Sequence, residues 1–315
     1  MTGSKKLFCF GYGYTADALT RALRADQNWT IVGTTRDPGK RDIMAENGID
    51  AHLFSSHHLI SDPLSLLRET THILVSTPPD DQGDPSFRLH GDDILNLPNL
   101  EWVGYLSTTG VYGDRGGEWV DERSHVQPTT RRGTRRARAE QQWLGLFDTE
   151  QIPVHIFRLA GIYGPGRSSL DSVRAGAARR INKPGHAFSR IHVDDIVQAL
   201  RASMAAPHPG SIYNLADDYP APSHEVIAYT CELLGKPVPP LLDYASADLA
   251  PITMSFYSDN KRIRNDKIKD ELKVRLLYPT FREGLLACRA AEEETRADQI
   301  PGYWFAEGRD IAEMD

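Results

Sequence analysis

The chain has few cysteines and no long apolar run. Its 315 residues include only Cys9, Cys231 and Cys288, which are odd in number and far apart, so the pattern argues against a disulfide framework. No stretch reaches the roughly 18 apolar residues that a membrane helix needs. The apolar run at residues 6–10 is too short for a signal peptide. These absences predict a cytoplasmic protein without a membrane partner.

Positive charge is also scarce. Lysine and arginine together number 36 against 43 acidic residues, the formal net charge is −7 and the pI is about 5.9. Nucleic-acid-binding domains are usually net basic, so we expect no nucleic-acid partner. The paired histidines and aspartates of the chain lack the spacing of metal ligands, and no metal site is predicted.

One segment departs from this acidic background. Residues 129–143, "TTRRGTRRARAEQQW", hold five arginines within eight positions. Three interpretations are open: a solvated helix, a site for an anionic substrate or cofactor phosphate, and a nucleic-acid surface. The anion site ranks slightly above the solvated helix, and nucleic-acid binding ranks last.

Short apolar runs alternate with helical patterns through the first half of the chain. The runs at 6–10, 29–35, 50–54, 71–77, 102–108 and 154–160 are predicted strands. Their continuous apolarity is typical of strands covered on both faces. Strands alternating with helices predict an α/β fold, a Rossmann-type doubly wound parallel sheet.

The regular alternation stops after residue 160. We predict a Rossmann domain over 1–164 and 191–219, a smaller substrate lobe over 165–190 and 220–290, and an acidic tail over 291–315. Glycine- and proline-rich segments near 161–169 and 182–190 are expected to be loops. A helix within 222–235 is expected to have Ser223 as its cap and Gly235 as its stop. The aromatic cluster Tyr303, Trp304 and Phe305 suggests that the tail docks on the protein.

A glycine-rich turn follows the first predicted strand. Gly11, Gly13 and Ala16 have the spacing G-x-G-x-x-A and open an amphipathic helix. Gly11 permits a tight turn, Gly13 permits close approach of a pyrophosphate, and Ala16 permits close packing of helix on strand. The pattern predicts a dinucleotide site.

The end of the second predicted strand bears on the choice of dinucleotide. NAD sites usually carry an acidic residue there, whereas this chain has Thr34 and Thr35 followed by Arg36. An arginine beside hydroxyls suits a 2′-phosphate, so NADP(H) is favoured over NAD(H). The alternative is that Asp37 contacts the ribose.

Four further segments carry a family resemblance: "YLSTTGVYGD" (105–114), "RLAGIYGPGR" (158–167), "RIHVDDIVQAL" (190–200) and "SIYNLADD" (211–218). In this order they resemble the extended short-chain dehydrogenase/reductase superfamily, which includes NAD-dependent epimerases and dehydratases. Residues 260–285 further resemble atypical members of it. The resemblance implies the Rossmann fold, a nicotinamide cofactor and cofactor contacts after the fourth strand.

The resemblance also exposes a missing catalytic pair. In active members a Ser or Thr ends the fifth strand and precedes a Tyr-x-x-x-Lys pair; Thr108 matches the first position. Arg132 then stands where Tyr is expected and Arg136 where Lys is expected, and residues 118–152 contain no tyrosine. Arginine can hold ribose hydroxyls and stabilise negative charge, but it cannot exchange a proton near neutral pH. Tyr112 or a water is therefore the expected proton donor.

These considerations give the predicted site. The catalytic candidates are Thr108, Tyr112, Arg132 and Arg136, and the substrate-binding candidates are Arg167 and Arg190. The predicted cofactor contacts are Gly11, Tyr12, Gly13, Tyr14, Thr15, Ala16, Thr35, Arg36, Thr77, Pro78 and Arg136. His192 and Asp195 are expected to be structural. The predicted function is NADP(H)-dependent oxidoreduction, or epimerase- or dehydratase-like chemistry, on a small or nucleotide-linked polar substrate that carries negative charge. The alternative is a catalytically silent NADP(H)-binding sensor, and the chain is expected to be a monomer or homodimer.

Overall fold

The computed structural model describes residues 4–26 and 28–298, which form two compact units. Unit 1 contains the chain up to Val111, Arg131–Arg158 and Val197–Tyr213. Unit 2 contains Tyr112–Thr130, Leu159–Ile196 and the chain from Asn214 onward. Each unit is therefore built from segments that are separated in the sequence.

A seven-stranded parallel sheet organises the fold, with strand order β11-β7-β5-β4-β1-β2-β3. Its strands are β1 (Lys5–Phe10), β2 (Trp29–Thr35), β3 (Asp50–Leu53), β4 (His72–Val75), β5 (Trp102–Thr108), β7 (Val154–Leu159) and β11 (Ile212–Leu215). Six of them coincide with the six predicted apolar runs. The α/β, Rossmann-type prediction is confirmed.

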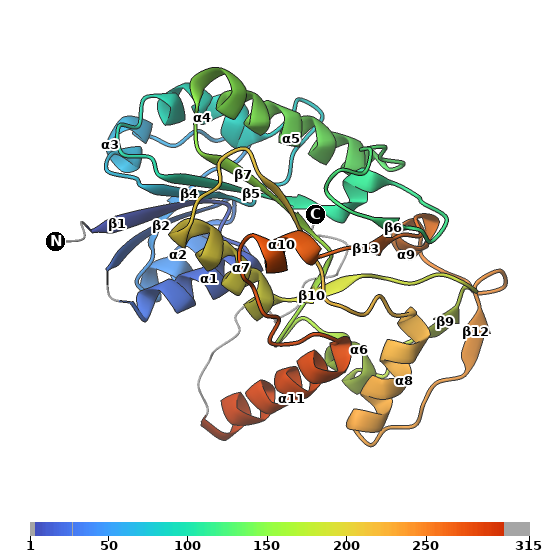
Figure 1. Cartoon of the computed structure of the whole chain (residues 1–315). Coiled ribbons are helices and arrows are strands. Elements are labelled where there is room, and N and C mark those ends of the chain that lie inside the picture. The colour runs from blue at the N-terminus through green and yellow to red at the C-terminus, as the bar shows by residue number, and fades with distance from the viewer. Residues whose placement is uncertain (1–3, 27, 299–315) are drawn as a thin grey trace. The chain divides into compact units, whose positions relative to one another are not determined.

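Helices cover both faces of the sheet in unit 1 (Figure 1). They are α1 (Tyr14–Arg24), α2 (Pro38–Glu46), α3 (Pro63–Leu67), α4 (Pro85–Leu95) and α5 (Arg131–Glu150). Figure 1 shows α1 and α2 on one face and α4 and α5 on the other. Between sheet and helices lies a buried core that includes Phe8, Phe10, Tyr105 and Trp143.

A repeated dipeptide begins three of these helices. Asp37, Asp62 and Asp84 are the N-caps of α2, α3 and α4, and a proline follows each. Each carboxylate accepts a backbone N–H of the first turn, and proline fits that turn because its missing N–H would have no helical partner. Asp-Pro therefore sets where the chain leaves the sheet edge.

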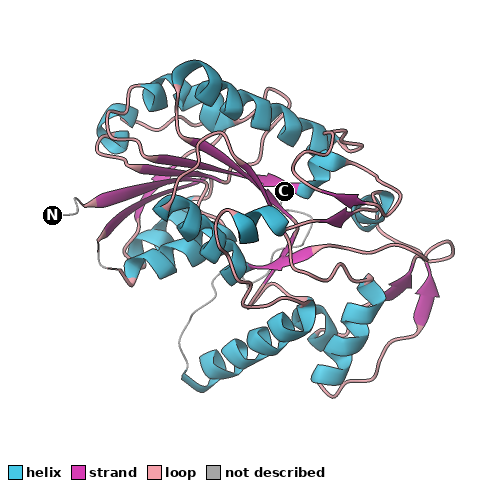
Figure 2. Cartoon of the chain, viewed as in Figure 1, coloured by secondary structure: helices cyan, strands magenta, loops and turns pink. Residues whose placement is uncertain are grey.

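Unit 2 combines short strand pairs with helices (Figure 2). β6 (Trp119–Val120) pairs with β13 (Arg262–Ile263), β8 (Gly161–Tyr163) with β10 (Arg190–His192), and β9 (Arg180–Asn182) with β12 (Leu241–Asp243). The helices are α6 (Ser169–Arg174), α8 (Ser223–Leu233), α9 (Pro251–Ser258), α10 (Asp266–Asp270) and α11 (Phe281–Asp298). Two further elements span the limits of the units: the 3₁₀ turn Thr109–Tyr112 and α7 (Val193–Ala205).

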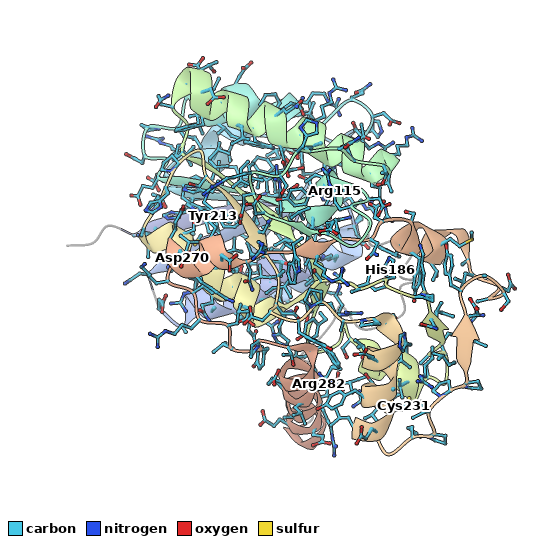
Figure 3. All side chains as sticks on the ribbon, turned by 45° about the vertical axis from the view of Figure 1, so that its right-hand side comes forward. Arg115, His186, Tyr213, Cys231, Asp270 and Arg282 are labelled. Carbon is cyan, nitrogen blue, oxygen red and sulfur yellow. The ribbon has the colours of Figure 1, made fainter. Side chains whose placement is uncertain are left out.

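The core of unit 2 joins α8 to α11. Phe281 and Cys288 of α11 are buried with Val226 of α8. The Arg282 guanidinium lies over the rings of Phe281 and Tyr229, so its cation covers the edge of this aromatic cluster (Figure 3).

Several sequence expectations for this part of the chain differ from the structure. The segment 112–130 lies in unit 2 because β6 pairs with β13 and the Asp114 carboxylate accepts the Asn260 N–H at 2.7 Å. The predicted loop 161–169 contains β8 and the first residue of α6, and the loop 182–190 begins with the last residue of β9 and ends with the first residue of β10, since short stretches there pair with strands elsewhere in the chain. Pro222, not Ser223, is the N-cap of α8, and it makes no side-chain cap bond.

The ends of two segments can also be compared with their predictions. Gly235 has a φ of +61° just after α8, as expected for a helix stop. Residues 291–298 of the predicted tail continue α11. The aromatic cluster at 303–305 lies outside the described residues.

Candidate functional site

The glycine turn connects β1 to α1. Gly11 has a φ of +81°, and a Cβ there would lie 3.1 Å from Ser76 Oγ and from Thr77 N. Only glycine enters this region without strain. Because Gly11 has no side chain, the turn can lie close to the segment that follows β4. Gly13 is the N-cap of α1, and a Cβ there would meet no atom within 4 Å. The space over the first turn of α1 is therefore open to a ligand, and the residues fit a dinucleotide pyrophosphate.

The side chains of this turn face the protein interior. Tyr12 and Tyr14 are buried, with exposed fractions of 2% and 6%, as are Thr15 and Ala16. The Tyr12 ring packs so closely on Gly33 of β2 that a Cβ there would lie 2.8 Å from it. The predicted cofactor contacts of these four residues can therefore come only from their backbone.

Thr34 holds the glycine turn by hydrogen bonds, a role that the sequence did not reveal. Its hydroxyl accepts the Gly11 N–H at 2.8 Å and donates to Cys9 O at 3.2 Å, and its carbonyl accepts the Tyr12 N–H at 2.7 Å. The side chain is fully buried. Thr34 thus stands at the expected acidic position but is committed to holding the glycine turn.

The next residues carry the charge at the end of β2. Thr35 is buried and its hydroxyl accepts the Asp37 N–H. Arg36 is exposed, and among residues 4–26 and 28–298 its side chain has no hydrogen-bond or ion-pair partner. Asp37 caps α2 by accepting the Lys40 N–H at 3.1 Å. An exposed cation thus lies next to a carboxylate that caps a helix.

Arg136 of α5 reaches the carboxyl ends of two strands. Its Nη1 donates to Leu106 O at 2.8 Å, to the Tyr105 hydroxyl at 3.0 Å and to Thr77 O at 3.5 Å. Within the described chain, its Nε and Nη2 have no partner. One nitrogen therefore fixes the guanidinium, and its other N–H donors remain available at the carboxyl ends of β4 and β5.

The loop after β4 carries the remaining predicted cofactor contacts. The Thr77 hydroxyl shares a hydrogen bond with Ser86 Oγ at 2.5 Å, so only its backbone is free to face a ligand. Pro78 is exposed. The Ser76 hydroxyl donates to Gly11 O, which ties this loop to the glycine turn.

Thr108 ends β5 above a buried ionic network. Its hydroxyl accepts the Gly110 N–H at 3.1 Å. The neighbouring Ser107 donates to Glu140 Oε1, and Glu140 pairs with Arg158 at 2.7 Å. Both charged side chains are at most 4% exposed. This network fixes α5 against β5 and β7, and its glutamate lies two residues after Arg138.

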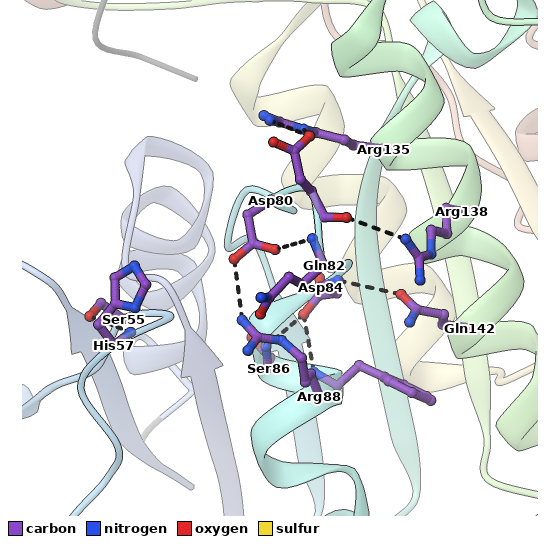
Figure 4. Close-up of polar contacts among 12 residues, drawn as sticks. Ser55, His57, Asp80, Gln82, Asp84, Ser86, Arg88, Arg135, Arg138 and Gln142 are labelled. Carbon is purple, nitrogen blue, oxygen red and sulfur yellow. Dashed lines mark hydrogen bonds and ion pairs between the residues drawn. The ribbon is translucent and has the colours of Figure 1, made fainter.

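The arginine run itself is divided between two tasks. Arg136 points to the strand ends as described, whereas Arg131 contacts Asp81 in the Asp80–Gly83 turn after β4. Arg135 and Arg138 contact the same residue (Figure 4). Arg132 is exposed. The run is therefore neither a uniformly solvated helix face nor a continuous basic stripe.

Tyr112 does not fit the predicted role of proton donor. It is fully buried in unit 2, and its hydroxyl donates to Asn214 Oδ1 at 2.7 Å. A buried phenol that is bonded within its own unit supports the loop after β5. The placement therefore favours a structural role for Tyr112 over that of proton donor.

The other candidates of unit 2 are also engaged. Arg190 Nη1 donates to Phe188 O and Ala221 O, both at 2.9 Å. Nearby Asp217 is buried, and this burial raises its pKa to about 8 although the Arg190 charge opposes the shift. Arg167 lies in a turn that is closed by backbone bonds with Gly164.

The His192 segment is structural, as expected. His192 is 1% exposed and lies 3.5 Å from Cys288 Sγ, and burial lowers its pKa to about 4. Asp195 accepts the backbone N–H groups of Leu277 and Tyr278. It therefore ties α7 to the segment before α11.

Within residues 4–26 and 28–298, no helix has the length and apolarity to cross a bilayer. In the same part of the chain, no three histidines, cysteines or acidic residues are grouped so as to hold a metal ion.

Comparison with known proteins extends these observations. No family model matches the chain. Protein YeeZ of Escherichia coli is 27% identical over 229 residues, which cover 70% of this chain and 79% of that protein. A solved structure from Silicibacter pomeroyi, described as a functionally unknown conserved protein, is 50% identical. It covers 92% of this chain and 99% of its own, with a TM-score of 0.83.

More distant structures share the fold. A dTDP-glucose 4,6-dehydratase from Bacillus anthracis, solved with NAD, is 17% identical over 94% of this chain and 98% of its own, with a TM-score of 0.70. A UDP-glucuronic acid 4-epimerase from Bacillus cereus, also with NAD, is 14% identical over 95% and 99%, with a TM-score of 0.74. The chain belongs to the family of the Silicibacter pomeroyi protein, and it has the fold of these dehydratases and epimerases.

Proposed function

We propose that this protein is an NADP(H)-dependent enzyme that carries out oxidoreduction, or epimerase- or dehydratase-like chemistry, on a small or nucleotide-linked polar substrate. The observation that carries the proposal is the open glycine turn at the start of α1, flanked by the exposed Arg36. The distant dehydratase and epimerase of the same fold were both solved with NAD, which supports a nicotinamide cofactor here.

Each part of the site has a role in holding the cofactor. The N–H groups of the first turn of α1, around Gly13, would take the pyrophosphate. Arg36 would pair with a 2′-phosphate. The free Nε and Nη2 groups of Arg136 would bind ribose hydroxyls beside Thr77. When bound, the nicotinamide supplies hydride transfer.

The chain's own residues would then orient the substrate. The Thr108 hydroxyl would position the reacting oxygen, and the permanent charge of Arg136 would stabilise negative charge that develops on it. Arg132 would add to this electrostatic stabilisation. Because Tyr112 is buried and bonded to Asn214, we assign proton delivery to a water.

A paired fluorescence titration with NADPH and NADH tests the nucleotide assignment. We expect tight NADPH binding, weaker NADH binding, and a loss of about 10- to 100-fold in NADPH affinity in Arg36→Ala, since charge-assisted hydrogen bonds contribute about 1.5–3 kcal/mol. Arg68→Ala is the matched control, because Arg68 is an exposed arginine of unit 1 outside the site. Equal binding of the two nucleotides would refute the NADP preference, and binding of neither would refute the enzyme assignment.

A silent NADP(H)-binding sensor is the second candidate. The observation that favours it is the arginine at position 132, in a helix that contains no tyrosine. The double variant Arg132→Tyr/Arg136→Lys separates the two candidates. Reductase activity gained by the variant supports the sensor, whereas loss of an activity present in the native protein supports the enzyme.

A further inference from the structure

Three arginines of α5 contact Asp81, two of them through its carboxylate and one through its backbone carbonyl. Arg131 Nε and Arg135 Nε donate to Asp81 Oδ1 at 3.1 and 2.8 Å, and Arg131 Nη2 pairs with Asp81 Oδ2. Arg138 Nη1 donates to the Asp81 carbonyl at 3.3 Å. The spacing of four and three residues places the three side chains on one helix face. We call Arg131, Arg135 and Arg138 the arginine face.

The charge of the arginine face is not balanced. Two guanidiniums pair with the Asp81 carboxylate and the third donates to the Asp81 carbonyl, so three cations lie around one anion and two positive charges are in excess. Asp80 does not compensate, because it accepts from Arg88 Nη2 at 3.2 Å and from the Gln82 N–H at 2.8 Å (Figure 4). The first turn of α5 carries no acidic residue. In an otherwise acidic chain, this is a local surplus of cationic donors.

The carboxylate that occupies the face is easily replaced. The side chains of Asp81 and Arg131 are 58% and 74% exposed, and exposed ion pairs contribute little to stability because water competes with them. The Arg135 and Arg131 guanidiniums hold the pKa of Asp81 below its usual range, so it is an anion throughout the neutral range. Asp81 thus occupies a position in which a doubly charged anion would neutralise more of the positive charge than its single carboxylate does.

The same loop connects the arginine face to the proposed cofactor site. Thr77, whose carbonyl accepts from Arg136, lies four residues before Asp81, and Arg136 lies next to Arg135 on α5. Both anion-binding groups therefore come from the same helix and loop within unit 1.

We propose that the arginine face binds a phosphate group of the substrate, which displaces the Asp81 carboxylate. Guanidinium forks match phosphate oxygens in bidentate geometry, and a phosphate dianion in place of the Asp81 carboxylate neutralises one more of the three positive charges. The assignment rests on the proposed function and narrows its substrate class to phosphorylated compounds.

The test is calorimetric titration of inorganic phosphate into the protein saturated with NADPH, so that the glycine turn does not bind the probe. We expect Asp81→Asn to bind phosphate at least about 10-fold more tightly than the native chain, because the competing carboxylate is gone. Arg135→Gln is expected to lose at least the same factor. Arg88→Gln, which removes an arginine that binds Asp80 but not the arginine face, should leave phosphate affinity unchanged.

Several results would overturn the assignment. They are equal phosphate affinity in the native chain and Asp81→Asn, no loss in Arg135→Gln, an equal loss in Arg88→Gln, and no phosphate binding by any variant. Far-ultraviolet circular dichroism verifies that each variant is folded. Arg131→Gln removes a second arginine of the face, one that is more exposed than Arg135. A different result, the absence of NADPH binding, would refute the proposed function. In that case phosphate is titrated without nucleotide into the Gly13→Val variant, in which the new side chain blocks the glycine turn.

Discussion

Removing the charge of Glu140 should destabilise the protein far more than removing a surface carboxylate. Glu140 accepts from Arg158 Nη2 at 2.7 Å, from Arg158 Nε at 3.1 Å and from Ser107 Oγ, and both charged side chains are almost inaccessible to water. In Glu140→Gln the buried Arg158 cation loses the charge of its carboxylate partner. Breaking a buried pair in this way costs about 3–5 kcal/mol of the free energy of unfolding. Since a domain is stabilised by about 5–15 kcal/mol in total, the variant should be only marginally folded.

Urea denaturation followed by tryptophan fluorescence measures this loss. The matched control is Asp26→Asn, because Asp26 pairs with Arg201 at 2.9 Å while both side chains are more than 40% exposed. The control should lose no more than about 1 kcal/mol. Replacing both partners, in Glu140→Gln/Arg158→Met, should recover part of the loss because no charge then remains buried. A Glu140→Gln variant within 1 kcal/mol of the native chain would refute the reasoning, since the pair would then be shielded by water.

Three further predictions concern the glycine turn, Tyr112 and Asp217. Gly13→Ala should leave the free energy of unfolding within about 0.5 kcal/mol of native while weakening NADPH binding. Gly11→Ala should lower the free energy of unfolding by at least about 1 kcal/mol, because its φ of +81° disfavours a side chain. Equal destabilisation of the two variants in denaturant titrations would contradict this. Tyr112→Phe should cost about 1 kcal/mol for its lost hydrogen bond but leave kcat within tenfold, and a loss of a thousandfold or more would restore Tyr112 as proton donor. Burial raises the pKa of Asp217 to about 8, so the folded state holds a proton that the unfolded state has released between about pH 4 and 8. Stability should therefore fall as pH rises through this window, by up to about 1.4 kcal/mol per pH unit. Urea titrations at several pH values should show this slope reduced in Asp217→Asn but not in Asp270→Asn, an exposed control.

The strands and the glycine turn were predictable because short-range patterns determine them. Continuous apolar runs indicate buried parallel strands. Glycine is needed at position 11 for a positive φ, and at position 13 it leaves the space over the helix start open. The Asp-Pro pairs that begin α2, α3 and α4 are an equally local signal.

What escaped prediction depends on partners far along the chain. Thr34 looks like a missing acidic residue in the sequence, yet its hydroxyl is committed to Gly11, 23 positions away. Tyr112 looks like a spare phenol beside Thr108, yet Asn214 is 102 positions away. The assignment of 112–130 to unit 2 likewise depends on pairing with residues near 262. Side chains choose among many acceptors of similar chemistry, and only the folded chain determines which one is near.

The anchoring of Arg136 bears on how this site tolerates mutation. Two of its three acceptors are the backbone carbonyls of Leu106 and Thr77, and these oxygens persist whatever side chain stands at either position. Side chains at 77 and 106 can therefore drift without displacing the cation. Constraint falls instead on position 136 and on the course of the chain at the ends of β4 and β5. Divergent relatives of this protein should consequently vary at the side chains around the guanidinium while keeping the backbone that holds it.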